Sequence, residues 1–417
     1  GLTAPRRDIA ENPKKLKIEE IEAAQLVRAL PDVDLAIING NYAILGGLKV
    51  ADALSAEKAD SIAATTYANI LAVRAGDENR PELKALIDAL KSDQVKEFMT
   101  KKYEGAGGDN LMYCIAIEEI AKKCATSSVV VAAHTSLCMG PIMAFGTEEQ
   151  KMKWIPDLAS GRKIGAFGLT EPGAGTDASG QQTTAVKDGD DWILNGSKCF
   201  ITNGDTASTY TVLAVTDRAK GYRGMTMFVV EKGMPGFSTG VHEKKMGIRG
   251  SSTTDLIFED VRVPDANRLG KVGQGWQVVM HTLNGARAGV AAQALGIGEG
   301  ALDLAMKYVQ ERMQFKKKLS KFQRTQFEIA DMHTKLEAGK LLVYSAACKE
   351  DAYNKGDKTQ NYAMDSAMAK LFCGEAASDV TRRCVQLFGG YGYIREYQVE
   401  RMMRDAKITE IYEGTSE

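Results

Sequence analysis

The period of the hydrophobic positions differs from one part of the chain to the next. In residues 1–103, short apolar runs at 34–39 and 67–73 contain β-branched residues, as buried parallel strands do. From Asn79 onward the apolar positions follow a helical period instead. This alternation predicts an α/β segment over 1–103.

A cluster of glycines at 105–108 interrupts this pattern. Asp109 or Asn110 could then cap a helix, because a short polar side chain at that place accepts hydrogen bonds from the first free N–H groups. We predict a domain boundary at 104–108 and a helical segment over 104–163.

The pattern changes again over residues 164–270. Short apolar runs such as TVLAV and MTMFVV are separated by turn sequences such as KDGDD and NGSK. This spacing predicts a β domain, either a sandwich or a barrel.

Helical periodicity returns over residues 271–417. Phe322, Ile329, Leu336 and Val343 recur every seven residues, as they would along the buried seam of long antiparallel helices. The predicted fold class is therefore multidomain α+β, with an N-terminal α/β segment, a middle β-barrel or sandwich domain and a C-terminal four-helix bundle.

Composition narrows the class of protein. The 417 residues predict two or three domains, and a formal net charge of -1 gives no basic excess for nucleic acid and no acidic excess for disorder. No apolar run approaches the roughly 18 residues of a spanning helix, and no signal peptide is recognisable, so we expect a cytoplasmic protein with no membrane partner. Seven scattered cysteines without a CxxC pair and four histidines without ligand spacing argue against a disulfide framework and a metal site.

The densest candidate for chemistry is the loop FGLTEPGAGTDASG, residues 167–180. Glycines let backbone N–H groups approach a ligand, and hydroxyl groups add donors, so the loop could hold a phosphate or a polar heterocycle. A Rossmann loop is excluded because a hairpin pattern, not a helix, follows. Taken alone, the loop also fits an ordinary turn between strands.

Three further clusters have plain structural explanations when each is taken alone. CFITNG at 199–204 fits a strand that ends in a turn, and QLFGGYGYIREY at 386–397 fits a helix C-cap. In KITEIYEGTSE at 407–417, Glu413 lies between an aromatic residue and a glycine and could be a base whose pKa is raised by burial. On its own, a solvated surface glutamate is the more frequent case.

Together the four clusters resemble, in order and spacing, the acyl-CoA dehydrogenase family, and the resemblance covers roughly residues 104–417. The motif sequences are most similar to those of the short-chain, butyryl-type members. The resemblance implies an FAD enzyme that oxidises a short-chain acyl-CoA to 2-enoyl-CoA. Glu413 matches the base that removes the α proton while hydride passes from the β carbon to flavin N5. Residues 104–163 would then be a remnant of the family's N-terminal helical domain.

The resemblance also assigns the remaining site residues. Some family branches carry the base immediately before the arginine matched by Arg287, but that place is Ala286 here, which leaves Glu413. The positions matched to acyl-CoA binding are Thr176, Asn284, Arg287 and Gly414. The positions matched to FAD binding are Phe167, Leu169, Thr170, Thr176, Phe200, Ile201, Thr202, Arg312, Gln323, Gln386, Phe388, Gly389, Gly390, Thr415, Ser416 and Glu417.

Partners follow from the same resemblance. An electron-transferring flavoprotein would accept the electrons, and a homotetramer built as a dimer of dimers would complete each FAD site, since the residues matched by Arg312, Gln323 and Gln386 reach a neighbouring subunit's FAD.

Residues 1–103 do not resemble that family. Their amino-acid sequence is similar to the C-terminal part of methionine-type substrate-binding lipoproteins of ABC importers, which suggests a chimeric chain. An alternative function is therefore an amino-acid (methionine-like) binding module fused to an inert dehydrogenase portion. The dehydrogenase is favoured because its cofactor and base motifs are complete, whereas the binding module lacks its first lobe.

Overall fold

The computed structural model describes residues 35–39, 55–56, 69–73 and 109–416. The chain divides into two compact units, one formed by Gly1–Gly108 with Ala159–Gly161 and the other by Asp109–Leu158 with Arg162–Glu417. Each unit is described by itself.

The first unit contains a three-stranded sheet in the order β1-β3-β2. Its strands are β1 (Leu35–Asn39), β2 (Ser55–Ala56) and β3 (Asn69–Val73). Both apolar runs therefore form strands, but β1 and β3 pair antiparallel, so the expectation of parallel strands is wrong. An apolar run alone does not specify the direction of its neighbour. The helical pattern after Asn79 lies outside the described residues.

The second unit begins with helices whose start is well capped. The Asp109 carboxylate accepts a hydrogen bond from Met112 N at 2.9 Å, and Asp351 accepts from Asn110 N and Leu111 N at 2.7 and 3.2 Å, which confirms the predicted cap. The helices are α5 (Asn110–Lys123), α6 (Ala125–Ala132), a π-helical segment (Ala133–Met139), α7 (Gly140–Phe145) and α8 (Glu148–Ala159).

The helical run Ala125–Phe145 corrects one expectation from the sequence. By length and composition it is long and apolar enough to cross a membrane, although polar residues interrupt it. It also packs within the unit, because His134 Nδ1 accepts a hydrogen bond from Gly165 N at 2.9 Å and Leu137 O accepts one from the Thr211 hydroxyl at 3.2 Å. The core helix of a soluble protein passes the same length and composition test.

The middle of the chain forms an eight-stranded sheet in the order β11-β8-β7-β5-β6-β10-β9, with β4 paired parallel to β7. The central strand β7 is buried on both faces: Tyr210, Val212 and Ala214 pack in one core, and Leu213 and Val215 in the other. The strands are β4 (Gly165–Gly168), β5 (Thr184–Asp188), β6 (Asp191–Thr202), β7 (Thr209–Val215), β8 (Met225–Glu231), β9 (Phe237–Thr239), β10 (Thr253–Pro264) and β11 (Arg268–Leu269).

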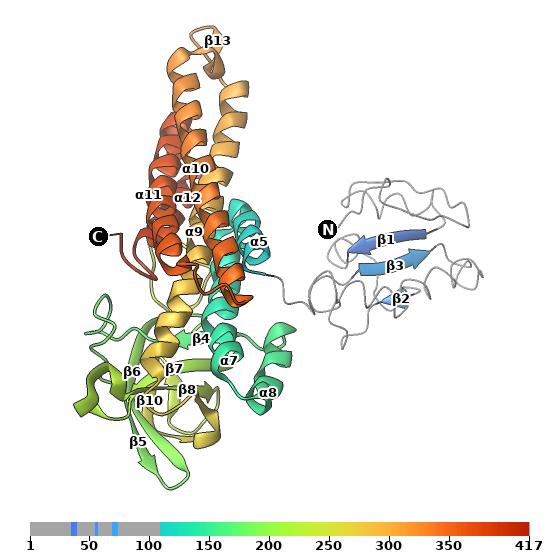
Figure 1. Ribbon diagram of the computed structural model, residues 1–417. Helices are drawn as coiled ribbons and strands as arrows, with labels where there is room; N and C mark the ends of the chain where they lie inside the picture. Colours follow the sequence, from blue (N-terminus) through green and yellow to red (C-terminus); the bar gives the residue numbers. More distant parts are fainter. Residues whose placement is uncertain (1–34, 40–54, 57–68, 74–108, 417) are drawn as a thin grey trace. The chain divides into compact units, whose positions relative to one another are not determined.

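Long helices follow the sheet in the chain and pack side by side with α5 (Figure 1). They are α9 (Gly275–Glu311), α10 (Gln323–Asn354), α11 (Tyr362–Phe388) and the short α12 (Val399–Ala406), and a hairpin of β12 (Met313–Gln314) and β13 (Lys317–Lys318) joins α9 to α10.

The predicted seam of α10 is largely confirmed. Leu336 and Val343 are buried in the bundle core, and Ile329 packs against it. Phe322 precedes the helix and packs instead against Phe315 of the hairpin.

Glycines of helix α9 allow the backbone of α5 to pack closely against it. A Cβ atom at Gly296 would lie 2.2 Å from Glu118 O, and one at Gly300 would lie 2.2 Å from Lys122 O. These contacts fix α5 against the bundle, where it carries residues toward Glu413.

Candidate active site

Glu413 lies in the turn that follows α12, in a conformation that is unusual for its residue type. Its φ is 52°, and Gly414 next to it has φ 112°. The Glu413 side chain is half-buried, but its Oε2 atom is fully enclosed and has no hydrogen-bond partner in the described part of the chain. A strained residue with an unpaired buried carboxyl oxygen is typical of a functional site.

The electrostatics of Glu413 suit a base. Burial raises its carboxyl pKa from 4.5 to about 7, while the cations Lys370 and Arg287 act in the opposite direction. A carboxylate with a pKa near neutrality is both ionised in a large fraction of molecules and able to accept a proton.

Three of the predicted substrate-binding positions gather around this turn. Arg287 Nε donates to Glu413 O at 3.4 Å, and Arg287 Nη1 donates to Asn284 Oδ1 at 3.0 Å. On the other side, Lys370 Nζ donates to Gly414 O. The turn that carries Glu413 is therefore held by cations from both α9 and α11.

Two tyrosines also line the surroundings of Glu413. The Tyr412 hydroxyl donates to Gln293 Oε1, and Gln293 Nε2 donates to Ala125 O at 3.1 Å. The Tyr113 ring of α5 lies so close to α9 that a Cβ atom at Gly289 would be 2.4 Å from its hydroxyl. Burial raises the pKa of both tyrosines, so both remain protonated at neutral pH.

A second buried carboxyl group, Glu350 of α10, lies near this cluster. A Cβ atom at Gly285 would be 2.5 Å from its Oε1, and its Oε2 is buried without a hydrogen-bond partner among the described residues. Burial, with a smaller contribution from the charge of Asp351, raises the pKa of Glu350 from 4.5 to about 7. The folded protein thus holds Glu350 protonated over a range in which the unfolded chain ionises it.

Glu350→Gln is expected to stabilise the protein at alkaline pH. Because the pKa of Glu350 is raised on folding, the free energy of unfolding is highest below about pH 4.5. It falls as the pH rises toward 7, since in this range only the unfolded chain releases the Glu350 proton. The neutral amide removes this loss, so the free energy of unfolding at pH 8 should rise by about 2 to 3 kcal/mol, with little change at pH 4.5.

Urea unfolding of wild type and variant at both pH values measures the effect. Glu148→Gln is the matched control, because the Glu148 side chain is 82% exposed and its substitution should leave the pH dependence unchanged. An equal shift at pH 4.5 and pH 8 would contradict the assignment.

The first glycine-rich loop and the end of β6 lie next to each other. Thr170 O accepts a hydrogen bond from Cys199 N at 2.8 Å, which places Thr170 beside Phe200. Phe200 is 65% exposed with φ 58°, whereas Phe167, Leu169 and Ile201 have buried side chains and can offer a ligand only their backbone. Thr202 is half-buried, and Thr176 is exposed on the loop.

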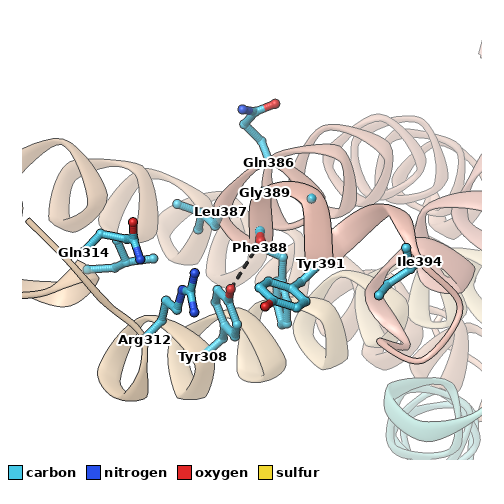
Figure 2. Close-up of a pocket in the computed structure, with 11 residues that line it drawn as sticks. Tyr308, Arg312, Gln314, Gln386, Leu387, Phe388, Gly389, Tyr391 and Ile394 are labelled. Atoms are coloured by element: carbon cyan, nitrogen blue, oxygen red, sulfur yellow. Dashed lines mark hydrogen bonds between the residues drawn. The ribbon is translucent and has the colours of Figure 1, made fainter.

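A pocket of about 420 Å³ contains five of the predicted residues, which lie at or just after the C-terminal ends of α9 and α11 (Figure 2). Its lining includes Arg312, Gln386, Phe388, Gly389 and Gly390. Figure 2 shows Tyr308 of α9 and Arg312, which directly follows α9, facing the end of α11. No described atom lies within 4 Å of a Cβ built at Gly389 or Gly390, so the backbone there is open to a ligand.

Aromatic contacts shape this pocket. Tyr308 stacks on Phe388 with ring centroids 4.1 Å apart and donates its hydroxyl proton to Phe388 O at 3.3 Å. The Arg312 guanidinium lies 5.2 Å from the centre of the Tyr391 ring.

The remaining predicted residues lie outside this pocket lining. Gln323 is exposed at the start of α10, and Thr415 is exposed just after Glu413. Ser416 N donates to Glu410 O at 2.9 Å, and Ser416 Oγ is buried without a partner in the residues described. Glu417 is outside the described residues.

Sequence reasoning missed several residues of the site. Lys370, Tyr113, Gln293 and Glu350 lie within helices, where no local pattern distinguishes them from core or surface positions. Only contacts with residues more than 40 positions away identify them.

Family models match three parts of the chain. Residues 166–261 match the middle domain of acyl-CoA dehydrogenases, residues 273–417 match the C-terminal domain of acyl-CoA dehydrogenases, and residues 1–109 match the NlpA lipoprotein family. The lipoprotein match ends at residue 109, and the first dehydrogenase match begins at residue 166.

Relatives in sequence match about three quarters of the chain. The short-chain specific acyl-CoA dehydrogenase of Clostridium acetobutylicum is 55% identical over 76% of this chain and 82% of the relative. A subunit of the caffeyl-CoA reductase-Etf complex of Acetobacterium woodii is 47% identical, again over 76% and 82%.

Solved structures agree in fold. Butyryl-CoA dehydrogenase from Megasphaera elsdenii superposes with a TM-score of 0.73 at 52% identity, over 76% of this chain and 82% of the other. A structure from work on the electron transferring flavoprotein of Acidaminococcus fermentans also gives 0.73, at 54% identity over the same shares. A glutaryl-CoA dehydrogenase from Mycobacterium smegmatis in complex with FADH2 gives 0.69 at 36% identity, over 75% and 78%.

Proposed function

The chain belongs to the acyl-CoA dehydrogenase family, and from that membership we propose that Glu413 is the base that starts the reaction. The protein is an FAD-dependent oxidoreductase that converts a short-chain acyl-CoA to 2-enoyl-CoA. The observation that carries the assignment of the base is the enclosed, unpaired Oε2 of Glu413 between Lys370 and Arg287.

The described residues fit FAD. Open backbone at Gly389 and Gly390, the guanidinium of Arg312 and the exposed ring of Phe200 supply surfaces for a flat, phosphate-bearing group. We assign the binding of one FAD to Thr170, Phe200 and Thr202 of one subunit. Arg312, Gln386, Gly389 and Gly390 of a neighbouring subunit complete the same site. When bound, FAD accepts the hydride that no protein side chain can accept.

The protein's own residues position the base and the substrate. Glu413 accepts the α proton of the thioester, and the turn at Gly414 is held by Lys370 and by Arg287 so that the carboxylate keeps one orientation. Tyr113 and Tyr412 are partly buried beside the base and limit the access of water to the transferred proton. Asn284 and Arg287, bonded to each other, are assigned to the CoA part of the substrate.

Partners are proposed from the relatives. An electron-transferring flavoprotein accepts the electrons, since two relatives carry that association in their descriptions. A homotetramer is proposed because Arg312, Gln323 and Gln386 lie on exposed or half-buried surface where another subunit can approach. We place the enzyme in the cytoplasm.

The lipoprotein match favours a second candidate for residues 1–109, the binding of a methionine-like amino acid. Isothermal titration of the full chain with methionine tests it, and the absence of heat at millimolar ligand would remove it.

The colour of the purified protein tests FAD binding, and reduction of the flavin by substrate tests the dehydrogenase activity. The purified protein should be yellow, and butyryl-CoA added without an acceptor should bleach the flavin absorbance. A colourless protein that cannot be loaded with FAD would contradict the proposal.

The pH profile provides a sharper test of the base. Because burial raises the pKa of Glu413 to about 7, the fraction of ionised base falls about tenfold per pH unit below that value. We expect kcat/KM for butyryl-CoA to rise with pH and to level off above about 7, measured between pH 5.5 and 9 with a dye acceptor.

Glu350 has a similar pKa and must be separated from Glu413. The same profile is therefore measured in Glu350→Gln, where the inflection should persist. If kcat/KM no longer depends on pH in that variant, the group that titrates near pH 7 is Glu350 and not Glu413.

A further inference from the structure

A buried ion pair connects the two chain segments that we assigned to the flavin. Lys198 of β6 has a side chain that is 0% exposed, and its Nζ lies 2.6 Å from Oε1 of Glu171, which is 4% exposed. Lys198 Nζ also donates to Gln181 Oε1 at 2.5 Å. The ammonium group thus has two oxygen partners, and its side chain is enclosed by the protein.

The Glu171 carboxylate has further partners from the backbone. Its Oε2 accepts from Gln182 N at 2.6 Å, and its Oε1 accepts from Thr183 N at 3.0 Å. With Lys198, three donors from two segments converge on one carboxylate. Burying such a pair carries a desolvation cost that apolar residues would avoid, so stability alone is a weak reason for its presence.

The location of the pair gives a better reason. Glu171 follows Thr170 directly, Lys198 precedes Phe200 by two residues, and Cys199 N between them donates to Thr170 O at 2.8 Å. The pair therefore fixes the distance between Thr170 and Phe200.

The backbone beyond Lys198 needs such support. Phe200 and Asn203 both have positive φ, 58° and 64°, although neither is glycine. Asn203 Nδ2 donates to Gly165 O and to Val130 O, each at 3.2 Å, and so holds the far end of the segment. Strained positions persist only where surrounding contacts determine them, and Lys198 is the buried contact on the near side.

We propose that Lys198 and Glu171 are positioning residues of the FAD site, which hold Thr170 and the exposed ring of Phe200 at the separation that the flavin requires. The inference rests on the proposed placement of the flavin between these segments. Neither side chain contacts the cofactor, because both are enclosed in the protein.

Lys198→Met tests the inference, with FAD affinity and the flavin spectrum as readouts. Apoprotein is titrated with FAD by fluorescence quenching, the visible spectrum of the bound flavin is recorded, and Tm is measured separately. We expect Kd to rise by roughly tenfold or more and the flavin band to lose fine structure, because the ring of Phe200 is no longer held.

Two further variants distinguish positioning from stability. Lys340→Met breaks another ion pair of the same length, Lys340 Nζ to Glu299 Oε1 at 2.6 Å, in the helical bundle. It should lower Tm while leaving the Kd for FAD within about twofold. Glu171→Gln keeps the shape of the side chain and serves if Lys198→Met does not fold; its Kd should rise at least about threefold.

The outcomes separate the two levels of proposal. A wild-type protein that fails to take up FAD contradicts the proposed function. If wild type binds FAD but Glu171→Gln and any folded Lys198→Met bind it within about twofold of wild type, or if Lys340→Met weakens binding as much, the positioning role is overturned.

Discussion

Glu413→Gln is expected to reduce butyryl-CoA turnover by at least about 10² to 10⁴-fold while the protein still binds FAD and acyl-CoA. The amide retains the shape of the carboxylate and the backbone contacts of the turn with Arg287 and Lys370, but it cannot accept the α proton. The rate of flavin bleaching by butyryl-CoA, compared with the Kd for FAD, measures the two properties separately.

Glu410→Gln is the matched control for this variant. Glu410 lies three residues before Glu413, and its side chain, 16% exposed, pairs with the more exposed Lys407. Its substitution should leave bleaching nearly unchanged. Equal bleaching by wild type and Glu413→Gln would remove Glu413 from the reaction.

Gly296→Ala is expected to cause the largest loss of stability, about 3 kcal/mol or more in the free energy of unfolding. The new Cβ atom would lie 2.2 Å from Glu118 O and 2.8 Å from Ala121 Cβ, and a backbone carbonyl cannot turn away as a flexible side chain can. Helix α5 would have to move from α9, and Tyr113 would move with it, so activity should fall as well.

Gly140→Ala shows what the same substitution does without a clash. Gly140 is also helical, but an added Cβ would meet only Thr135 O at 3.8 Å. Alanine favours the helix by up to about 1 kcal/mol over glycine, so this variant should be neutral or slightly stabilised. Urea unfolding of both variants measures the difference, and similar stabilities would contradict the close packing of α5 on α9.

Features encoded by neighbouring residues were predictable from the sequence. The cap at Asp109 depends on a side chain and an N–H group three residues apart, and the seam at Leu336 and Val343 depends on helical spacing. The cluster of Arg312 with Gly389 and Gly390 was accessible only through resemblance to a family, because 77 residues separate the two parts.

Features that depend on tertiary contacts were not predictable. Nothing in the sequence near Lys198 marks it as buried, yet the structure encloses this residue completely, with Glu171 and Gln181 converging on it. Lys370 likewise lies within a helix with no local pattern that singles it out, and its role depends on the carbonyl of Gly414. The antiparallel pairing of β1 and β3 was missed because periodicity does not encode direction.

The start of α5 has a consequence for how such a chain can arise and be engineered. The first N–H groups of this helix are satisfied by Asp109 and by Asp351, both within the second unit. A change of sequence before Gly108 therefore removes none of these hydrogen-bond acceptors. The position is suited to the exchange of coding segments: a different leading module can be grafted there without unravelling the helix that follows.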